Sequence, residues 1–308
     1  MINLNDVVKE LKKAVVGKDQ VLAKALITIL AGGHILLEDI PGVGKTTMAL
    51  AFSQVLGMEY NRMQFTPDVL PSDITGYMAY NSATGEMRYQ PGTAMCNLFL
   101  ADELNRATSR TQSALLEVME EGRVTVDGVT RRVPDPFCVI ATQNPVGAKG
   151  TQLLPDSQLD RFMTRLSLGY PEYDDEVDML RLKGQQSGRL ELTPMCSIEE
   201  LRAIRGAVQR VYTNREILEY IVNLVTATRN HSAIIQGSSP RGTIALMSVA
   251  KAVAFVHGRD YVVPEDVGSM FKEVMAHRII WTPEAENGVY QEKVLNNILQ
   301  TTAVRRVR

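Results

Sequence analysis

The chain has few cysteines and no long apolar run, and both features narrow the possible classes of protein. Its three cysteines, Cys96, Cys138 and Cys196, lie far apart and show neither disulfide nor metal-ligand spacing. We therefore expect reduced, structural thiols and a cytoplasmic location. No stretch approaches the roughly 20 apolar residues of a membrane span. Polar residues interrupt any signal-peptide pattern near the start.

A strong net charge is also missing. The formal net charge is −2 at pH 7, so no broad basic field favours nucleic acid by electrostatics alone. We interpret the short basic segment 305–308 as a solvated chain end. With 308 residues, the chain is long enough for two domains with separate cores.

A glycine-rich loop is the clearest motif that the chain does contain. Residues 34–48 read HILLEDIPGVGKTTM, an apolar strand followed by a loop and the start of a helix, which is typical of a phosphate-binding P-loop. Gly42 and Gly44 allow backbone N–H groups to converge on an anion, and the helix N-terminus adds partial positive charge. Lys45 suits the β- and γ-phosphates, and the Thr46 hydroxyl suits Mg²⁺.

One position departs from the P-loop pattern. Asp39 stands where the pattern has its first glycine. The alternative is an ordinary glycine-rich turn between a strand and a helix, so neighbouring motifs have to support the assignment. We predict nucleotide contacts from Asp39, Pro41, Gly42, Val43, Gly44, Lys45, Thr46 and Thr47.

An acidic pair forms the second motif. The apolar segment 97–101 predicts a buried strand, and Asp102 and Glu103 follow directly. Downstream of a P-loop, Asp102 would hold Mg²⁺, and Glu103 would orient and polarise the attacking water. The alternative is an acidic start to the next helix, at 108–121, favoured by the helix dipole. The upstream P-loop favours the catalytic interpretation.

An amide at a further strand end is a weaker signal. The predicted strand at 137–142 is followed by Gln143, Asn144 and Pro145. Asn144 would sense the γ-phosphate or align the water beside the acidic pair. Asn-Pro is also a good turn pair, and without context that alternative prevails.

The order of predicted elements indicates the fold class. Apolar strands alternate with helices, which is typical of a parallel α/β sheet with its ligand at the carboxyl ends of the strands. The strands are expected at 34–38, 59–65, 97–101, 137–142 and 164–168. Hairpins are expected at 76–91 and 123–133, and a proline-rich linker at 66–73. Beyond residue 171 only helical patterns occur, one of them over 264–278, so we predict an α/β core over 1–184 and an all-helical lid over 185–308.

Seven sequence blocks, in order, resemble the AAA+ ATPases of the MoxR family. They are GGHILLEDIPGVGKT (32–46), QFTPDVLPSDITG (64–76), LADELNRATSRTQSALLEVMEEGRVTVDG (100–128), ATQNP (141–145), LPDSQLDRF (154–162), SSPRG (238–242) and GRDYVVPEDV (258–267). The resemblance covers nearly the whole chain. It implies a P-loop AAA+ core with a five-stranded parallel sheet, followed by a helical lid domain.

Residue roles follow from this resemblance. It implies that Asn144 is the sensor-1 residue, Arg161 an arginine finger that reaches a neighbouring subunit's nucleotide, and Arg241 the sensor-2 residue. From the residues alone, Arg161 as an ion-pair partner of Asp160 and Arg241 as a surface residue would be preferred. The resemblance reverses that preference.

Two further segments bear on the match. Val16 and Gly17 precede the core where many AAA+ proteins contact adenine through the backbone, although a helix-breaking glycine explains the same letters. After Gly92 the family usually has proline and a bulky apolar pair, whereas this chain has Thr-Ala-Met-Cys at 93–96. That departure puts the packing of the first hairpin in question.

The resemblance implies a function. It indicates an ATP hydrolase that uses ATP and Mg²⁺, assembles into a hexameric ring, and drives chaperone-like remodelling or cofactor and metal insertion in partner proteins. Clients with von Willebrand A domains are expected. Two alternatives remain: a nucleic-acid motor with Arg123 and Arg131–Arg132 in its pore, and a nucleotide-gated binding module with little turnover.

Overall fold

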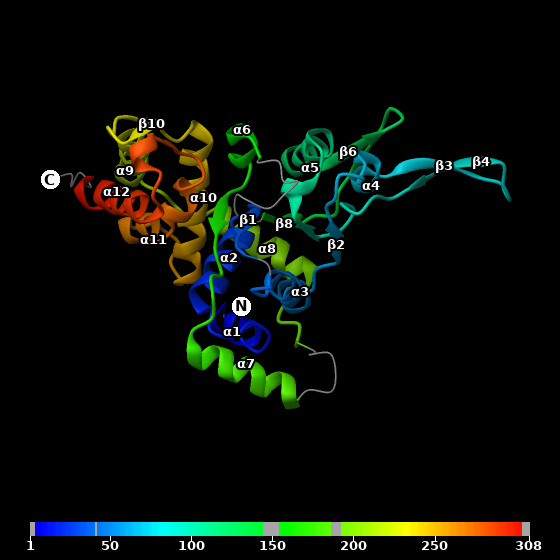
Figure 1. The fold of residues 1–308 in the computed structure, drawn as a ribbon, viewed down its shortest axis with the longest axis horizontal. Coiled ribbons are helices and arrows are strands. Elements are labelled where there is room, and N and C mark those ends of the chain that lie inside the picture. The colour runs from blue at the N-terminus through cyan, green and yellow to red at the C-terminus, as the bar shows by residue number, and fades with distance from the viewer. Residues whose placement is uncertain (1–3, 41, 144–153, 186–191, 304–308) are drawn as a thin grey trace. The chain divides into compact units, whose positions relative to one another are not determined.

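The computed structural model describes residues 4–40, 42–143, 154–185 and 192–303 (Figure 1). The chain divides into two compact units whose segments interleave along the sequence. A core unit comprises Met1–Ala23, His34–Leu154 and Leu166–Arg202, and a lid unit comprises Lys24–Gly33, Pro155–Arg165 and Ala203–Arg308. The boundary near residue 185 stays a prediction.

The central sheet confirms the predicted fold class. Its five strands are β1 (Ile35–Glu38), β2 (Tyr60–Gln64), β5 (Leu98–Asp102), β8 (Cys138–Gln143) and β9 (Thr164–Leu166), in the order β2-β5-β8-β1-β9. The pairs β2–β5, β5–β8 and β8–β1 are parallel. Every residue of β5 and β8 is buried, as expected for the centre of a parallel sheet. The register pairs Glu38 with Gln143 and Gln64 with Asp102, so polar residues end several strands at one edge.

Helices of the core unit form largely where the apolar patterns predict them. They are α1 (Leu4–Leu11), α3 (Lys45–Val55), α5 (Ser109–Glu121) and α7 (Tyr173–Gln185), while α2 (Asp19–Leu30) and α8 (Ile198–Gln209) span both units. A short helix, α4 (Pro71–Thr75), and a single turn, η1 (Leu104–Arg106), add to these.

The linker predicted at 66–73 is wrong in part, because α4 begins inside it. Pro71 occupies the first turn, where its missing N–H costs nothing. The Asp73 carboxylate accepts a hydrogen bond of 2.8 Å from the Leu70 N–H. Proline and aspartate together therefore start a helix here.

Two hairpins extend beyond the sheet (Figure 1). They are β3 (Tyr77–Asn81) with β4 (Glu86–Gln90), and β6 (Arg123–Val126) with β7 (Val129–Arg132). The second turns through Asp127 and Gly128, which have φ of 49° and 76°, as a tight hairpin requires.

The unusual segment after Gly92 packs against α4. The Thr93 N–H and hydroxyl both donate to Asp73 O, at 2.9 and 2.8 Å, and Ala94 N–H donates to Ile74 O at 3.1 Å. Ala94 is fully buried. Thr93 and Ala94 thus fit closely beside α4.

The lid unit is helical, with one addition. Its helices are α9 (Arg215–Arg229), α10 (Pro240–Val256), α11 (Pro264–Met275) and α12 (Gly288–Thr301), with the short α6 (Asp156–Leu159) and the turn η2 (Pro283–Ala285). Strands β10 (Ile234–Gln236) and β11 (Ile280–Trp281) form a small antiparallel pair. Leu246 and Phe271 are among its fully buried side chains. The helix predicted over 264–278 ends three residues early, at Met275.

The cysteines lie in the interior, as the sequence predicts. Cys96, Cys138 and Cys196 are all buried. Burial raises the pKa of Cys96 to about 12 and that of Cys196 to about 11. Both therefore remain protonated thiols at neutral pH, which suits a structural role.

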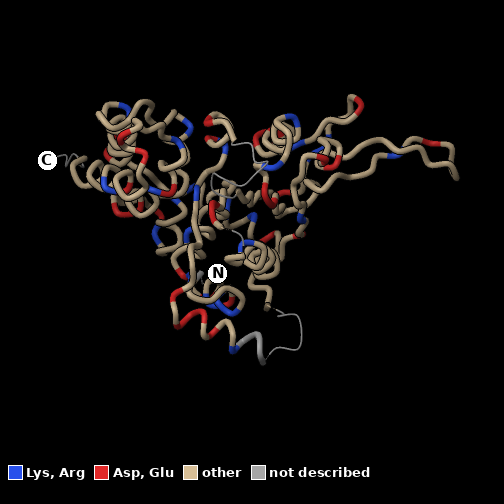
Figure 2. The backbone as a smooth tube through the Cα atoms, in the orientation of Figure 1, with Lys and Arg blue, Asp and Glu red and all other residues tan. Residues whose placement is uncertain are grey.

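Charged residues of both signs are distributed along the chain. Figure 2 shows Lys and Arg interspersed with Asp and Glu along the described chain, in keeping with the formal net charge of −2. None of the described helices has the length and apolar character that crossing a membrane requires.

Candidate functional site

The P-loop connects the end of β1 to the start of α3. Gly42 and Gly44 have φ of 89° and 98°, in the left-handed region that favours glycine. A Cβ at either position would meet no atom within 4 Å, so conformation rather than crowding selects glycine. Thr46 and Val43 are half-buried and Thr47 is exposed. Pro41, also predicted to contact nucleotide, lies outside the described residues.

Lys45 is the buried cation of this loop. Its side chain is 7% exposed, and its Nζ donates a hydrogen bond of 2.7 Å to Asp39 O. Burial lowers the pKa of Lys45, and the negative charges of Asp39, Asp102 and Glu103 oppose that shift. The nearby negative charges partly offset the loss of solvation of the Lys45 ammonium, and an incoming phosphate would offset it further.

Asp39 has a structural role that explains its departure from the P-loop pattern. One carboxylate oxygen accepts hydrogen bonds from Ser167 Oγ at 2.7 Å and Gly169 N–H at 3.0 Å. The other accepts from Leu168 N–H at 2.6 Å. Glycine would lose all of these contacts. Asp39 thus anchors the P-loop to the segment that follows β9.

We expect Asp39→Ala to lower the free energy of unfolding by about 3 kcal/mol, because the buried Leu168 N–H and two part-buried donors, on Ser167 and Gly169, lose a charged acceptor. Urea denaturation would measure the change. Asp68→Ala, at an exposed position, is the matched control. A stability for Asp39→Ala equal to that control would show that the anchor contributes nothing.

The acidic pair lies at the end of β5, as predicted. Asp102 is 8% exposed and accepts hydrogen bonds from Thr142 Oγ1 at 2.7 Å and from Arg62 Nη2 at 2.7 Å. Glu103 adopts the left-handed conformation, with φ of 56°. Its N–H donates to the same Thr142 hydroxyl at 2.8 Å, and its carboxylate pairs with Arg106 at 2.8 Å.

The left-handed conformation of Glu103 is unusual for a residue with a side chain. Such backbone costs about 1–2 kcal/mol in a residue with a side chain, and it concentrates at functional sites. The Thr142 hydroxyl holds it in place by bonding to both members of the pair. The carboxylate of Asp102 bonds to Thr142 and Arg62, whereas that of Glu103 pairs with Arg106, so the two adjacent acids have different partners.

Several partners at this site were not predicted from the sequence. Thr142 reads as an ordinary β-branched strand residue, and Arg62 reads as an exposed cation in β2. The side-chain amide of Gln143 donates a hydrogen bond of 2.9 Å to the Glu38 carboxylate, a contact that was also not predicted. For Thr142 and Gln143, the usable signal was two polar residues in the last positions of an apolar strand. Asn144 lies outside the described residues.

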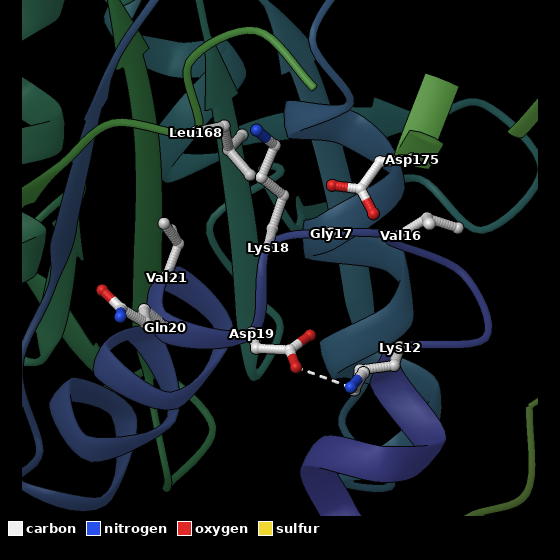
Figure 3. Close-up of a pocket in the computed structure, with 9 residues that line it drawn as sticks. All are labelled: Lys12, Val16, Gly17, Lys18, Asp19, Gln20, Val21, Leu168 and Asp175. Carbon is white, nitrogen blue, oxygen red and sulfur yellow. Dashed lines mark hydrogen bonds and ion pairs between the residues drawn. The ribbon is translucent and has the colours of Figure 1, made fainter. Parts of the chain in front are cut away.

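A cavity lies beside the P-loop anchor (Figure 3). It has a volume of about 570 Å³ and is lined by Lys12, Val16, Gly17, Lys18, Asp19, Gln20, Val21, Leu168 and Asp175. Gly17 has φ of 72°, and a Cβ there would lie 1.9 Å from the Asp175 carboxylate. Leu168 both lines the cavity and donates its N–H to Asp39. The predicted base-contacting residues thus border a cavity next to the phosphate loop.

The two predicted arginines belong to the lid unit. Arg161 follows α6 and is half-buried, and Arg241 is exposed in the first turn of α10. Ser239 caps that helix, its hydroxyl accepting from the Arg241 N–H at 3.1 Å. Asp160, which the sequence suggested as a partner of Arg161, pairs with Arg278 at 2.8 Å.

Similarity to known proteins agrees with this arrangement. Residues 34–164 match the ATPase family associated with various cellular activities (AAA), and residues 226–298 match the AAA lid domain. The protein YeaC of Bacillus subtilis is 45% identical over 302 residues, covering 98% of this chain and 94% of that protein. Chaperone MoxR1 of Mycobacterium tuberculosis is 36% identical over 313 residues, covering 97% and 81%.

A solved structure shows the same fold. The crystal structure of a protein from Cytophaga hutchinsonii superposes with a TM-score of 0.92 at 37% identity, covering 99% of this chain and 95% of that one. The 36% identity to Chaperone MoxR1 extends over nearly the whole chain, so it includes both the region that matches the AAA family and the region that matches the AAA lid domain. The protein is therefore a member of the MoxR family of AAA+ ATPases.

Proposed function

We propose that the protein hydrolyses ATP to ADP and phosphate at the carboxyl edge of its sheet. The observation that carries this is the Thr142 hydroxyl, which donates to the Asp102 carboxylate and accepts from the Glu103 backbone N–H. Burial lowers the pKa of Lys45, and the negative charges of Asp102 and Glu103 act against that effect and raise it. A simple turn between a strand and a helix would need none of these contacts.

In this proposal the loop binds the phosphates and the cavity receives the base. The N–H groups of residues 42–45 and the Lys45 ammonium hold the phosphates. The adenine enters the cavity bordered by Val16 and Gly17. Leu168 supports both regions because its N–H anchors Asp39 and its side chain lines the cavity.

The donor set at the loop suits Mg²⁺. The Asp102 carboxylate and Thr46 hydroxyl are hard oxygen ligands, and Mg²⁺ commonly takes only one or two of these from the protein and the rest from phosphates and water. When bound, Mg²⁺ neutralises charge on the phosphates. Asp102 is kept in place for this by Thr142 and Arg62.

Glu103 acts on the water in this proposal. Its carboxylate accepts a proton from the attacking water and orients it toward the γ-phosphorus. Asn144 would help align that water. Arg161 of a neighbouring chain stabilises charge on the transferred phosphoryl group, and Arg241 links the lid to the nucleotide state. These roles require a ring, which we propose has six chains.

The proposed work is chaperone-like remodelling of partner proteins, including insertion of metals or cofactors. A relative named as a chaperone supports the general role. Partners with von Willebrand A domains remain part of the proposal on the basis of the family resemblance. Arg131, which could line the pore of a nucleic-acid motor, lies over the Tyr89 ring at 4.0 Å, and the low formal net charge of −2 favours protein clients.

We expect Lys45→Ala to weaken ATP binding on the order of 10–100-fold, because a charged hydrogen-bond donor to the phosphates is lost. Isothermal titration calorimetry with ATP would measure this. Lys9→Ala, at an exposed position of α1, is the control. Equal ATP affinity in both variants would contradict the proposal that ATP binds at this loop.

A further inference from the structure

Arg278 is a buried cation that the proposed reaction does not use. Its side chain is 2% exposed, and it follows the end of α11 in the lid unit. Its Nε donates to Asp160 Oδ1 at 2.8 Å, and its Nη2 to Phe162 O at 2.6 Å and Asp160 O at 3.2 Å. Its Nη1 donates to Met163 O at 3.1 Å and also to Val274 O. The backbone on both sides of Arg161 is therefore bound to one guanidinium group.

Asp160 extends this network to a second helix. Its Oδ1 accepts from Arg278, and its Oδ2 accepts from Ser239 Oγ at 2.8 Å. Ser239 is the N-cap of α10, and Arg241 lies in the first turn of that helix. One carboxylate thus joins the turn that carries Arg161 to the helix that carries Arg241.

Gly242 keeps these parts close together. A Cβ at this position would lie 2.0 Å from Ser238 Oγ and 2.9 Å from Arg278 Cδ. A side chain here would have to displace Ser238 Oγ and Arg278 Cδ. The glycine of the Ser-Ser-Pro-Arg-Gly motif therefore has a packing reason within the lid unit.

Burying the charged guanidinium of Arg278 in the lid unit costs free energy of desolvation. Burial lowers the pKa of Arg278 to about 10, opposed by the charge of Asp160, so the side chain remains cationic at neutral pH. Burial also lowers the pKa of the neighbouring His277 well below its usual value, so that ring is neutral. Replacing a buried ion pair by apolar residues is often neutral or stabilising. What an apolar side chain lacks is a set of directed bonds to the backbone around Arg161.

We propose that Arg278 and Asp160 are positioning residues for the arginine finger, which they hold in a fixed geometry relative to the helix carrying Arg241. This inference rests on the role proposed above for Arg161. Neither residue needs to touch nucleotide, because both act through the backbone that flanks Arg161.

The experiment uses mixed assemblies of full-length chains. A Glu103→Gln chain has a disabled site of its own but still offers Arg161 to its neighbour. Mixed with wild-type chains at a fixed ratio, it gives a reference rate of ATP hydrolysis. A second substitution in the Glu103→Gln chain then changes only what that chain supplies to wild-type sites.

We expect Arg278→Lys, added to the Glu103→Gln chain, to lower the mixture's rate nearly as far as Arg161→Ala does. In a uniform assembly, Arg278→Lys should lower kcat on the order of 10²-fold, as expected for a catalytic group displaced by about 1 Å. KM for ATP should stay unchanged because the ATP-binding residues of each chain are intact. A general loss of stability would not produce this separation.

Arg259→Lys is the matched control. Arg259 pairs with buried Asp266 at 2.5 and 2.7 Å and donates to Tyr261 O at 3.1 Å, in the same unit. It should lower the melting temperature without lowering the mixture's rate. If Arg278→Lys does not fold, Ser239→Ala takes its place, with Ser239→Thr expected to restore the rate through its hydroxyl.

Two contrary outcomes are distinguishable. If Glu103→Gln chains with Arg278→Lys support their neighbours as well as Glu103→Gln alone, the positioning role is wrong. If Arg161→Ala also makes no difference in such chains, the finger does not act on a neighbour, and the proposed function itself needs revision.

Discussion

Glu103→Gln should lower kcat for ATP hydrolysis by about 10²–10⁴-fold while leaving ATP affinity close to that of the wild type. Glutamine keeps the size of the side chain but cannot accept the proton of the attacking water. The residues proposed to hold the phosphates, including Lys45, remain in place. Single-turnover phosphate release, combined with an equilibrium binding measurement, would separate the two effects.

Glu117→Gln provides the matched control for this variant. Glu117 is exposed on α5 and lies on the same stretch of chain. Its replacement should change neither rate nor affinity. Unchanged phosphate release by Glu103→Gln would refute Glu103 as the base, whereas loss of ATP binding would indicate a role in holding the nucleotide.

Arg161→Ala should lower kcat on the order of 10³–10⁵-fold, the effect expected for an arginine finger. ATP binding should persist, because the binding residues of each chain are unaltered. Arg215→Ala is a suitable control, since Arg215 is 87% exposed and pairs with Glu219 on α9. Steady-state hydrolysis at a protein concentration that supports assembly would measure the loss.

Mixing two inactive variants would show whether the finger acts between chains. Arg161→Ala chains retain Glu103, and Glu103→Gln chains retain Arg161. A mixture should form some sites with both groups and recover activity that neither variant has alone. A rate no higher than the sum of the separate variants would contradict action in trans.

The sequence predicted the sheet well because its strands are strongly apolar. Residues 98–101 and 138–141 are buried on both faces of the sheet, so an apolar run without alternation identified them. Helix ends were less accurate. The apolar periodicity predicted a helix over 264–278, but α11 ends at Met275. Arg278, beyond the helix end, is buried against backbone carbonyls.

The site was predictable in its residue types and not in its partners. Asp102 and Glu103 follow an apolar strand, which is a local signal. Their contacts to Thr142 and Arg62 depend on which strands are neighbours and in what register. Asp39 looked like a mismatch because its partners, residues 167–169, lie more than a hundred positions away.

Buried arginines are especially hard to predict. Arg278 carries a charge, so composition alone assigns it to the surface. Arg278 donates to backbone carbonyls within residues 160–163, and a pattern of side chains in the sequence does not predict such contacts. Only the folded lid unit shows that Ser239, Asp160 and Arg278 meet.

Steady-state phosphate release from ATP, with Mg²⁺, most directly tests whether this chain is an active ATPase. The wild-type protein should release phosphate in proportion to enzyme concentration, and both Lys45→Ala and Glu103→Gln should abolish most of that release. No release by the wild type, or equal release by all three proteins, would contradict hydrolysis at the P-loop.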